Sequence, residues 1–149
     1  MNDDFCPPLL KSAIIDGPDT RSRFVLKENN AKYEAFNKNK KQAFSFQIDD
    51  NLIKTVETKK CDKGLFVDDG KIYLVELKGV DFNTACTQLL VTFKQLSILL
   101  PKYTYLCRTV VKEVPSKYNY PSSYRKLTAV LKKEKNAFKT GSEYLMEEI

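Results

Sequence analysis

The chain has 149 residues, of which 42% are hydrophobic and 30% charged, a composition typical of one globular domain with its own core. It contains no histidine, which excludes Ser-His-Asp and Cys-His catalysis. Its four cysteines form no Cys-x-x-Cys pair, which argues against a structural zinc site. The net charge of +6 suits a polyanionic partner such as nucleic acid.

No apolar run is long enough to span a bilayer, and the acidic, proline-containing start is unlike a signal peptide. We therefore expect a cytoplasmic protein without membrane contact. Residues 1–20 are predicted to form an irregular arm, because Pro7-Pro8 and Gly17-Pro18 interrupt regular structure. Within the arm, Leu9–Ile15 fits either a short helix or a short strand.

Arg21–Leu26 fits a short strand or a lead-in, and Asn30–Asn39 is predicted to be a helix with its alanines on the apolar side. Ala43–Ile48 alternates apolar and polar residues, which predicts a half-buried strand. After an Asp-Asp-Asn turn, Leu52–Val56 is predicted to be the returning strand.

The central feature is a predicted hairpin, in which Gly64–Val67 and Ile72–Val75 flank the turn Asp68-Asp69-Gly70. Because side chains alternate along a strand, Glu76 and Lys78 share the face of Ile72 and Leu74. A carboxylate and an ammonium group therefore leave the end of an otherwise apolar strand on one side.

The register of this hairpin decides whether Asp62 joins them. A two-residue turn would set Asp62 opposite Leu77, on the other face. A three-residue loop pairs Val67 with Lys71 and Asp62 with Glu76, and it gives Gly70 the left-handed position that glycine adopts at low cost. We choose the three-residue loop, which brings two carboxylates within reach of one cation.

Two carboxylates this close require a proton, a cationic side chain or a metal ion. Oxygen ligands without histidine favour Mg²⁺ or Mn²⁺, which polarise a phosphate and lower the pKa of a bound water. Lys78, two residues after Glu76, is placed to orient that water or to neutralise developing charge. An ordinary cross-strand ion pair on a surface hairpin is the competing interpretation.

Beyond the hairpin, Asp81 or Asn83 caps a predicted helix over Thr84–Leu99, and Tyr103–Val111 is predicted to be a buried strand. A strand, a helix of this length and a second strand indicate a crossover that lays the two strands parallel. The start of this helix is close to Lys78, where free backbone amides favour a phosphate.

The C-terminal part begins with a tyrosine-rich loop, 114–124, where cations next to aromatic rings suit unpaired bases and phosphates. Lys117, Arg125 and Lys126 are the candidate nucleic-acid contacts. Tyrosines that pack the loop onto the core are the alternative. A helix over about 122–135 and an acidic tail, 141–149, with the potential for a short helix complete a single domain over 1–149.

Asp62, Glu76 and Lys78 resemble the Asp…Glu-x-Lys signature of the PD-(D/E)XK nuclease superfamily, with Cys61 where many members have proline. The similarity extends over roughly Asn30–Val111, whose predicted order of helix, strand meander, helix and strand matches the superfamily core. It implies a restriction-endonuclease-like α/β fold: a central mixed sheet, made of an antiparallel meander and a crossover strand, flanked by helices.

The resemblance also implies roles for individual residues. Asp62 and Glu76 bind Mg²⁺ or Mn²⁺, with the main-chain carbonyl of Leu77, and Lys78 is the catalytic lysine. An acid on the first helix often completes such sites, which makes Glu34 a further candidate ligand. A solvated Glu34 fits the sequence equally well, and Glu28 is another alternative.

Some relatives, of the RecB type, carry a helix glutamine followed four residues later by tyrosine. Here Gln88 is followed by Thr92, so the pattern is incomplete. Gln88 is either a contact to phosphate or substrate, or a glutamine at the edge of the helix.

We therefore expect a magnesium-dependent endonuclease or deoxyribonuclease, with DNA favoured over RNA. The alternative is a catalytically inactive nucleic-acid-binding or assembly module of the same fold. One domain has one site, so cutting both strands of a duplex would require a homodimer or two visits. Any sequence preference would come from loops or from a partner protein.

Overall fold

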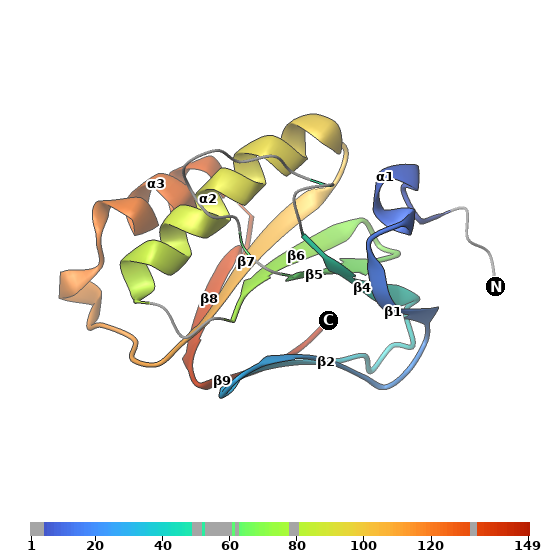
Figure 1. The fold of residues 1–149 in the computed structure, drawn as a ribbon, viewed down its shortest axis with the longest axis horizontal. Helices are drawn as coiled ribbons and strands as arrows, with labels where there is room; N and C mark the ends of the chain where they lie inside the picture. The colour runs from blue at the N-terminus through green and yellow to red at the C-terminus, as the bar shows by residue number, and fades with distance from the viewer. Residues whose placement is uncertain (1–4, 49–51, 53–60, 62, 78–80, 132–133) are drawn as a thin grey trace.

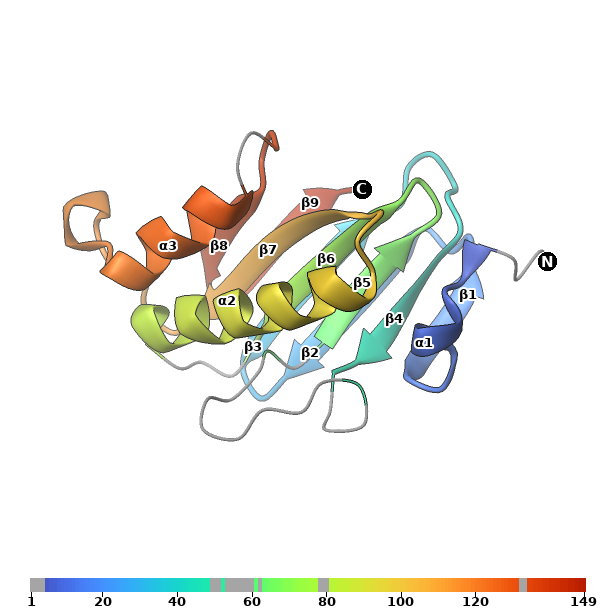
Figure 2. The same ribbon diagram turned by 90° about the horizontal axis from the view of Figure 1, so that it is seen from above.

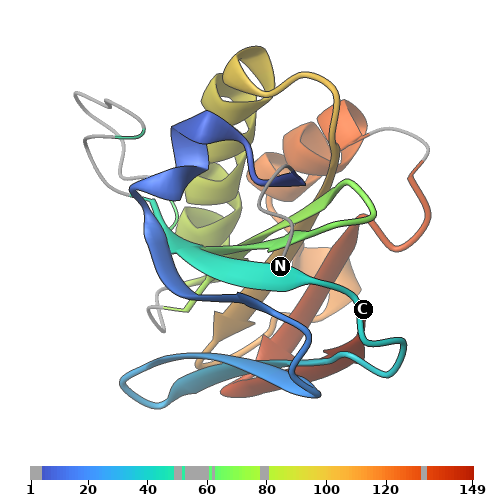
Figure 3. The same ribbon diagram turned by 90° about the vertical axis from the view of Figure 1, so that its right-hand side faces the viewer.

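The computed structural model describes residues 5–48, 52, 61, 63–77, 81–131 and 134–149. A six-stranded sheet forms the middle layer, with helices on one face and a three-stranded sheet on the other (Figures 1 and 3). The prediction of an α/β protein with a mixed sheet flanked by helices is confirmed. Within the described residues, no helix combines the length and apolarity required to cross a bilayer.

The strands of the middle sheet run in the order β1, β4, β5, β6, β7, β8, and those of the second sheet in the order β2, β3, β9. In chain order the elements are α1 (Pro8–Lys11), β1 (Ile14–Asp19), β2 (Arg23–Glu28), β3 (Ala31–Phe36), β4 (Ala43–Gln47), β5 (Lys63–Val67), β6 (Lys71–Glu76), α2 (Phe82–Leu99), β7 (Thr104–Val111), the 3₁₀ turn η2 (Lys117–Asn119), α3 (Ser122–Leu131), β8 (Phe138–Ser142) and β9 (Tyr144–Glu148).

The predicted meander and crossover form the centre of the middle sheet. Strands β4, β5 and β6 are antiparallel neighbours, and α2 connects β6 to β7, which pairs with it in parallel. Helices α2 and α3 lie side by side on the same face of this sheet (Figure 2). Of the returning strand predicted over Leu52–Val56, the structure describes only Leu52, in a turn; the rest lies outside the described residues.

The helix predicted over Asn30–Asn39 is wrong, because Ala31–Phe36 is strand β3. Ala31, Tyr33 and Ala35 are buried between the sheets, so the apolar positions follow the period of two of a strand. Asn29, with a φ of 52°, forms the turn that joins β2 to β3.

Both chain ends contain more regular structure than predicted. The arm is not irregular throughout: α1 is followed by β1, which pairs antiparallel with β4 through two register shifts. The tail is not helical: β9 pairs in parallel with β3 and forms an edge of the second sheet. Leu145, Glu147 and Ile149 lie inward, so a buried acid takes a position where a hydrophobic residue is expected.

Side-chain alternation along the middle strands separates two cores. On β6, Ile72 and Leu74 pack under the helices, whereas Tyr73 and Val75, and Leu77 just after the strand, pack against the second sheet. The alternation predicted for the second hairpin strand is therefore confirmed for these residues.

A buried ion pair connects the two sheets. From β7, Arg108 donates to Glu147 of β9 at 2.6 Å through Nε and at 3.1 Å through Nη2, and Tyr33 donates its hydroxyl to Glu147 at 2.7 Å. Burial opposes the ionisation of Glu147, but the hydrogen bonds and charge of Arg108 hold its pKa below the usual range. Burial near Glu147 also raises the pKa of Tyr73 to about 12.

Candidate functional site

The hairpin of β5 and β6 has the predicted register. Val67 pairs with Lys71, and the pairing continues through Gly64 with Leu74 to Lys63 with Val75. Gly70 has a φ of 89°, and its amide donates to the carbonyl of Val67 at 3.0 Å, as the three-residue loop requires. The pairing predicted for Asp62 is the next rung, and Asp62 lies outside the described residues.

Glu76 is the last residue of β6 and is 0% exposed. Because it alternates with Val75, its side chain lies on the face of Ile72 and Leu74, beneath the helices. The next residue, Leu77, directs its side chain to the inter-sheet core. Lys78, the predicted catalytic lysine, lies outside the described residues.

The strands next to Glu76 add hydroxyl groups that the sequence interpretation did not select. Glu76 pairs with Thr109 of β7, and the Thr109 hydroxyl donates to the hydroxyl of Thr140 on β8 at 2.5 Å. A polar row therefore crosses three parallel strands on their helix-facing side. In the sequence, Thr109 and Thr140 resemble any other threonine in a strand.

Helix α2, which packs on β6 and β7, has buried polar groups of its own. Gln88 is 3% exposed, and its Oε1 has no hydrogen-bond partner among the described residues. One turn later, the hydroxyl of Thr92 accepts from the amide of Cys61 at 2.9 Å and donates to the carbonyl of Gln88. Gln88 is thus buried rather than at an exposed helix edge, and α2 anchors the residue that precedes Asp62.

The start of α2 is capped as predicted. The Asp81 carboxylate accepts from the Thr84 amide at 2.9 Å and from the Thr84 hydroxyl at 2.8 Å. These bonds hold the pKa of Asp81 below its usual range.

The structure does not bring Glu34 to Glu76. Glu34 is on β3, and its side chain lies on the outer side of the second sheet, so the inter-sheet core separates the two carboxylates. Lys32 binds it at 2.6 Å and Tyr144 donates to it at 2.9 Å. Lys32 and Tyr144 hold the pKa of Glu34 low. Because residues 30–39 are not a helix, the reason for proposing Glu34 as a ligand no longer applies.

The candidate nucleic-acid residues near the C-terminus are exposed as that role requires. Lys117 is on η2, and Arg125 and Lys126 are on α3. Lys117 and Arg125 line a hollow of about 310 Å³ together with three tyrosines, Tyr118, Tyr120 and Tyr124.

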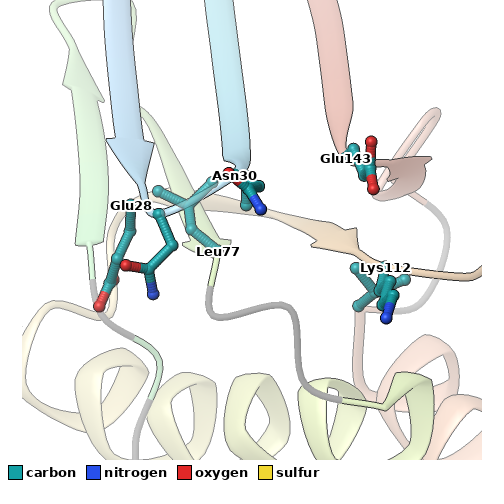
Figure 4. Close-up of a pocket in the computed structure, with 8 residues that line it drawn as sticks. Glu28, Asn30, Leu77, Lys112 and Glu143 are labelled. Atoms are coloured by element: carbon teal, nitrogen blue, oxygen red, sulfur yellow. The ribbon is translucent and has the colours of Figure 1, made fainter.

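A separate cavity of about 210 Å³ opens between the ends of the two sheets (Figure 4). The residues that line it lie at or just beyond strand ends: Glu28 and Asn30 where β2 turns into β3, Leu77 after β6, Lys112 after β7 and Glu143 after β8. Since Leu77 and Glu76 lie on opposite faces, this cavity is on the other side of the sheet from the predicted site.

The described residues contain no group of three or more cysteine, aspartate or glutamate side chains placed to hold a metal ion. Of the predicted donors, the structure places the Glu76 carboxylate and the Leu77 main chain at the end of β6. Comparison of the chain with protein-family models, with curated proteins and with solved structures finds no match.

Proposed function

We propose that the chain is a metal-dependent nuclease that hydrolyses phosphodiester bonds, with DNA as the favoured substrate. The observation that supports this most directly is Glu76, a fully buried carboxylate at the end of β6, on the helix-facing side of the sheet. Burying a carboxylate is costly unless a cation or hydrogen bonds compensate, so such positions are enriched at functional sites.

The arrangement of elements around Glu76 also supports the proposal. An antiparallel meander, β4–β5–β6, is followed by the crossover helix α2 and the parallel strand β7, the order expected of a restriction-endonuclease-like core. The departures are the missing helix at residues 30–39 and the added second sheet. The proposed likeness therefore covers β4 to β7 and not the first helix.

In this proposal, the acids at the start of β5 and the end of β6 hold one divalent ion. Extending the register by one rung would set Asp62 opposite Glu76, and the carbonyl of Leu77 would supply a further oxygen. A bound Mg²⁺ or Mn²⁺ would polarise the phosphate and make a water nucleophilic near neutral pH. Lys78 would orient that water, and the side-chain amide of Gln88 would hydrogen-bond the substrate.

The decisive experiment is incubation with labelled single- and double-stranded DNA and RNA in the presence of Mg²⁺ or Mn²⁺. Wild-type protein should cleave only with the ion, and Glu76→Gln, Asp62→Asn and Lys78→Ala should each lose cleavage. Glu148→Gln is the control that should keep cleavage, because it neutralises an exposed glutamate on β9, in the second sheet, and leaves the buried network intact. Ion-independent cleavage, or an active Glu76→Gln variant, would contradict the proposal.

The alternative is a nucleic-acid-binding or assembly module that lacks catalysis. It draws support from the hollow lined by Lys117, Tyr118 and Arg125, because cations beside aromatic rings suit nucleic acid without a metal ion. Thermal melting separates the two, because an ion at 100 times its dissociation constant stabilises the folded state by about 2.7 kcal/mol. A wild-type melt unchanged by Mg²⁺ and Mn²⁺ would favour the binding module.

A further inference from the structure

The segment between β7 and α3 presents a tyrosine that the fold does not use. Tyr118 is 100% exposed. Its neighbours are different: Tyr120 stacks on Phe82 with ring centroids 4.8 Å apart, and Tyr124 meets Phe138 edge-on at 5.2 Å. The packing interpretation of this loop therefore holds for Tyr120 and Tyr124. A fully exposed ring gains nothing from burial, so packing does not explain Tyr118.

The backbone around Tyr118 is held in a hydrogen-bonded turn. The amide of Asn119 donates to the carbonyl of Ser116 at 2.9 Å, and the side chain of Asn119 donates to the hydroxyl of Ser116 at 3.1 Å. The amide of Tyr120 donates to the carbonyl of Lys117 at 3.3 Å, which closes η2. The ring is thus presented from an ordered turn, which lowers the entropic cost of binding a partner.

The charges around the ring are positive. Lys117 and Arg125 are the charged residues that line the hollow of about 310 Å³ next to Tyr118, and Lys126 is an exposed neighbour. The hollow therefore combines an accessible aromatic face with two cations. Unpaired bases stack on such rings while cations neutralise the flanking phosphates.

The same segment also lines a groove at the start of α2. This groove, of about 580 Å³, lies between the start of α2, at Phe82 and Asn83, and the positions Lys112, Asn119 and Pro121. It includes acids as well, Asp81 and Glu113, so the favourable charge is concentrated in the hollow rather than in the groove. Figure 2 shows the segment beyond the start of α2, the helix that follows β6 and Glu76 in the chain.

We propose that Lys117, Tyr118 and Arg125 form a subsite for single-stranded DNA. Tyr118 stacks on one unpaired base, and the two cations contact the phosphates on either side. A paired base does not offer its face in this way, so the subsite selects single-stranded over duplex DNA. The inference rests on the proposed nuclease function for its biological meaning, but binding at the subsite needs neither the metal ion nor Glu76.

The test is fluorescence anisotropy with a labelled thymidine oligonucleotide and with a duplex of equal length, both in EDTA so that no cleavage occurs. Wild-type protein should bind the single strand more tightly than the duplex. Tyr118→Ala should weaken single-strand binding about 5-fold or more, and Tyr118→Phe should retain it. Ile98→Ala, which truncates a side chain that is 78% exposed at the other end of α2, should bind like wild type.

The salt dependence tests the two cations separately. Lys117→Ala/Arg125→Ala should reduce the slope of log K against log salt by about 1.4, because two single-strand phosphate contacts are lost. Lys102→Ala, an exposed lysine beyond the end of α2, is the charge control and should leave the slope unchanged.

The outcomes separate this subsite from the proposed nuclease. If Tyr118→Ala binds like wild type, or if duplex binds more tightly than single strand, the subsite is refuted while ion-dependent cleavage can stand. Tighter binding of a uridine oligonucleotide would overturn the assignment to DNA. If Tyr118→Ala loses binding but wild-type protein cleaves nothing with Mg²⁺ or Mn²⁺, the subsite stands and the nuclease proposal fails.

Discussion

Replacing Glu147 by leucine should destabilise the protein by about 3–5 kcal/mol. The substitution leaves the Arg108 guanidinium, on a residue 1% exposed, without its carboxylate, and the buried Tyr33 hydroxyl without its acceptor. Lys139, 3.4 Å from the same carboxylate, is more exposed and can turn to water. In a chain of this length the melting temperature should fall by about 6–20 °C.

Urea denaturation followed by circular dichroism measures the lost free energy of unfolding. A triple variant separates the effect of the unpaired buried charge from the effect of altered packing. Tyr33→Phe/Arg108→Met/Glu147→Leu removes every polar member of the network at once, and buried ion pairs replaced in this way are often neutral in stability. We expect the free energy of unfolding of the triple variant to be within about 2 kcal/mol of the wild-type value. A loss below about 1 kcal/mol for Glu147→Leu alone would refute the view that the network connects the sheets.

Three further predictions concern Gly64, the buried cysteines and the pH dependence of Glu147. Gly64→Ala should reduce the free energy of unfolding in urea by about 1–3 kcal/mol, because the new Cβ would overlap the Phe46 ring, and Phe46→Leu should partly restore the stability. The four cysteine thiols are buried, and burial raises the pKa of Cys86 and of Cys107 to about 12. A thiol reagent at pH 8 should therefore react with the native protein far more slowly than with the protein unfolded in urea. Fast reaction of the native protein would disprove this burial. Because the pKa of Glu147 is lower in the folded protein, its ionised carboxylate stabilises the fold above the ordinary pKa of 4.5, and this stabilisation is lost as pH falls through the folded pKa. The stability difference between wild type and Glu147→Leu should therefore shrink from pH 7 to pH 3.

The centre of the middle sheet was predictable because its signals are local. Asp68-Asp69-Gly70 places a glycine where a left-handed residue is needed, and the period of two on Ile72–Glu76 identifies both faces of the strand. The length and periodicity of α2 then imply the parallel crossover. These features are contained in about fifty consecutive residues and need no distant partner.

The second sheet was not predictable in the same way, because distant partners create it. Ala31–Phe36 satisfies both a short helical and a strand pattern, and pairing with β2 and β9 decides for the strand. The acidic tail forms a strand with Glu147 directed inward, and Arg108, thirty-nine residues away, compensates the buried charge by donating hydrogen bonds to it. Glu34 was a candidate ligand for the same reason, since that role depended on the helix that pairing excludes.

Two of the buried carboxylates among the described residues, Glu147 and Glu76, lie in different surroundings. Glu147 has a cation, a hydroxyl and a second, longer-range lysine around it, and it joins two layers, which is sufficient reason for its burial. Glu76 lies at the end of β6, on the helix-facing side of the middle sheet, and pairs with Thr109, whose hydroxyl donates to that of Thr140. A charge buried for stability should make its neutral variant unstable, whereas one buried for ion binding should lose the ion's effect with little loss of metal-free stability. The comparison of Glu76→Gln with Glu147→Gln therefore asks which of these two reasons applies at the end of β6.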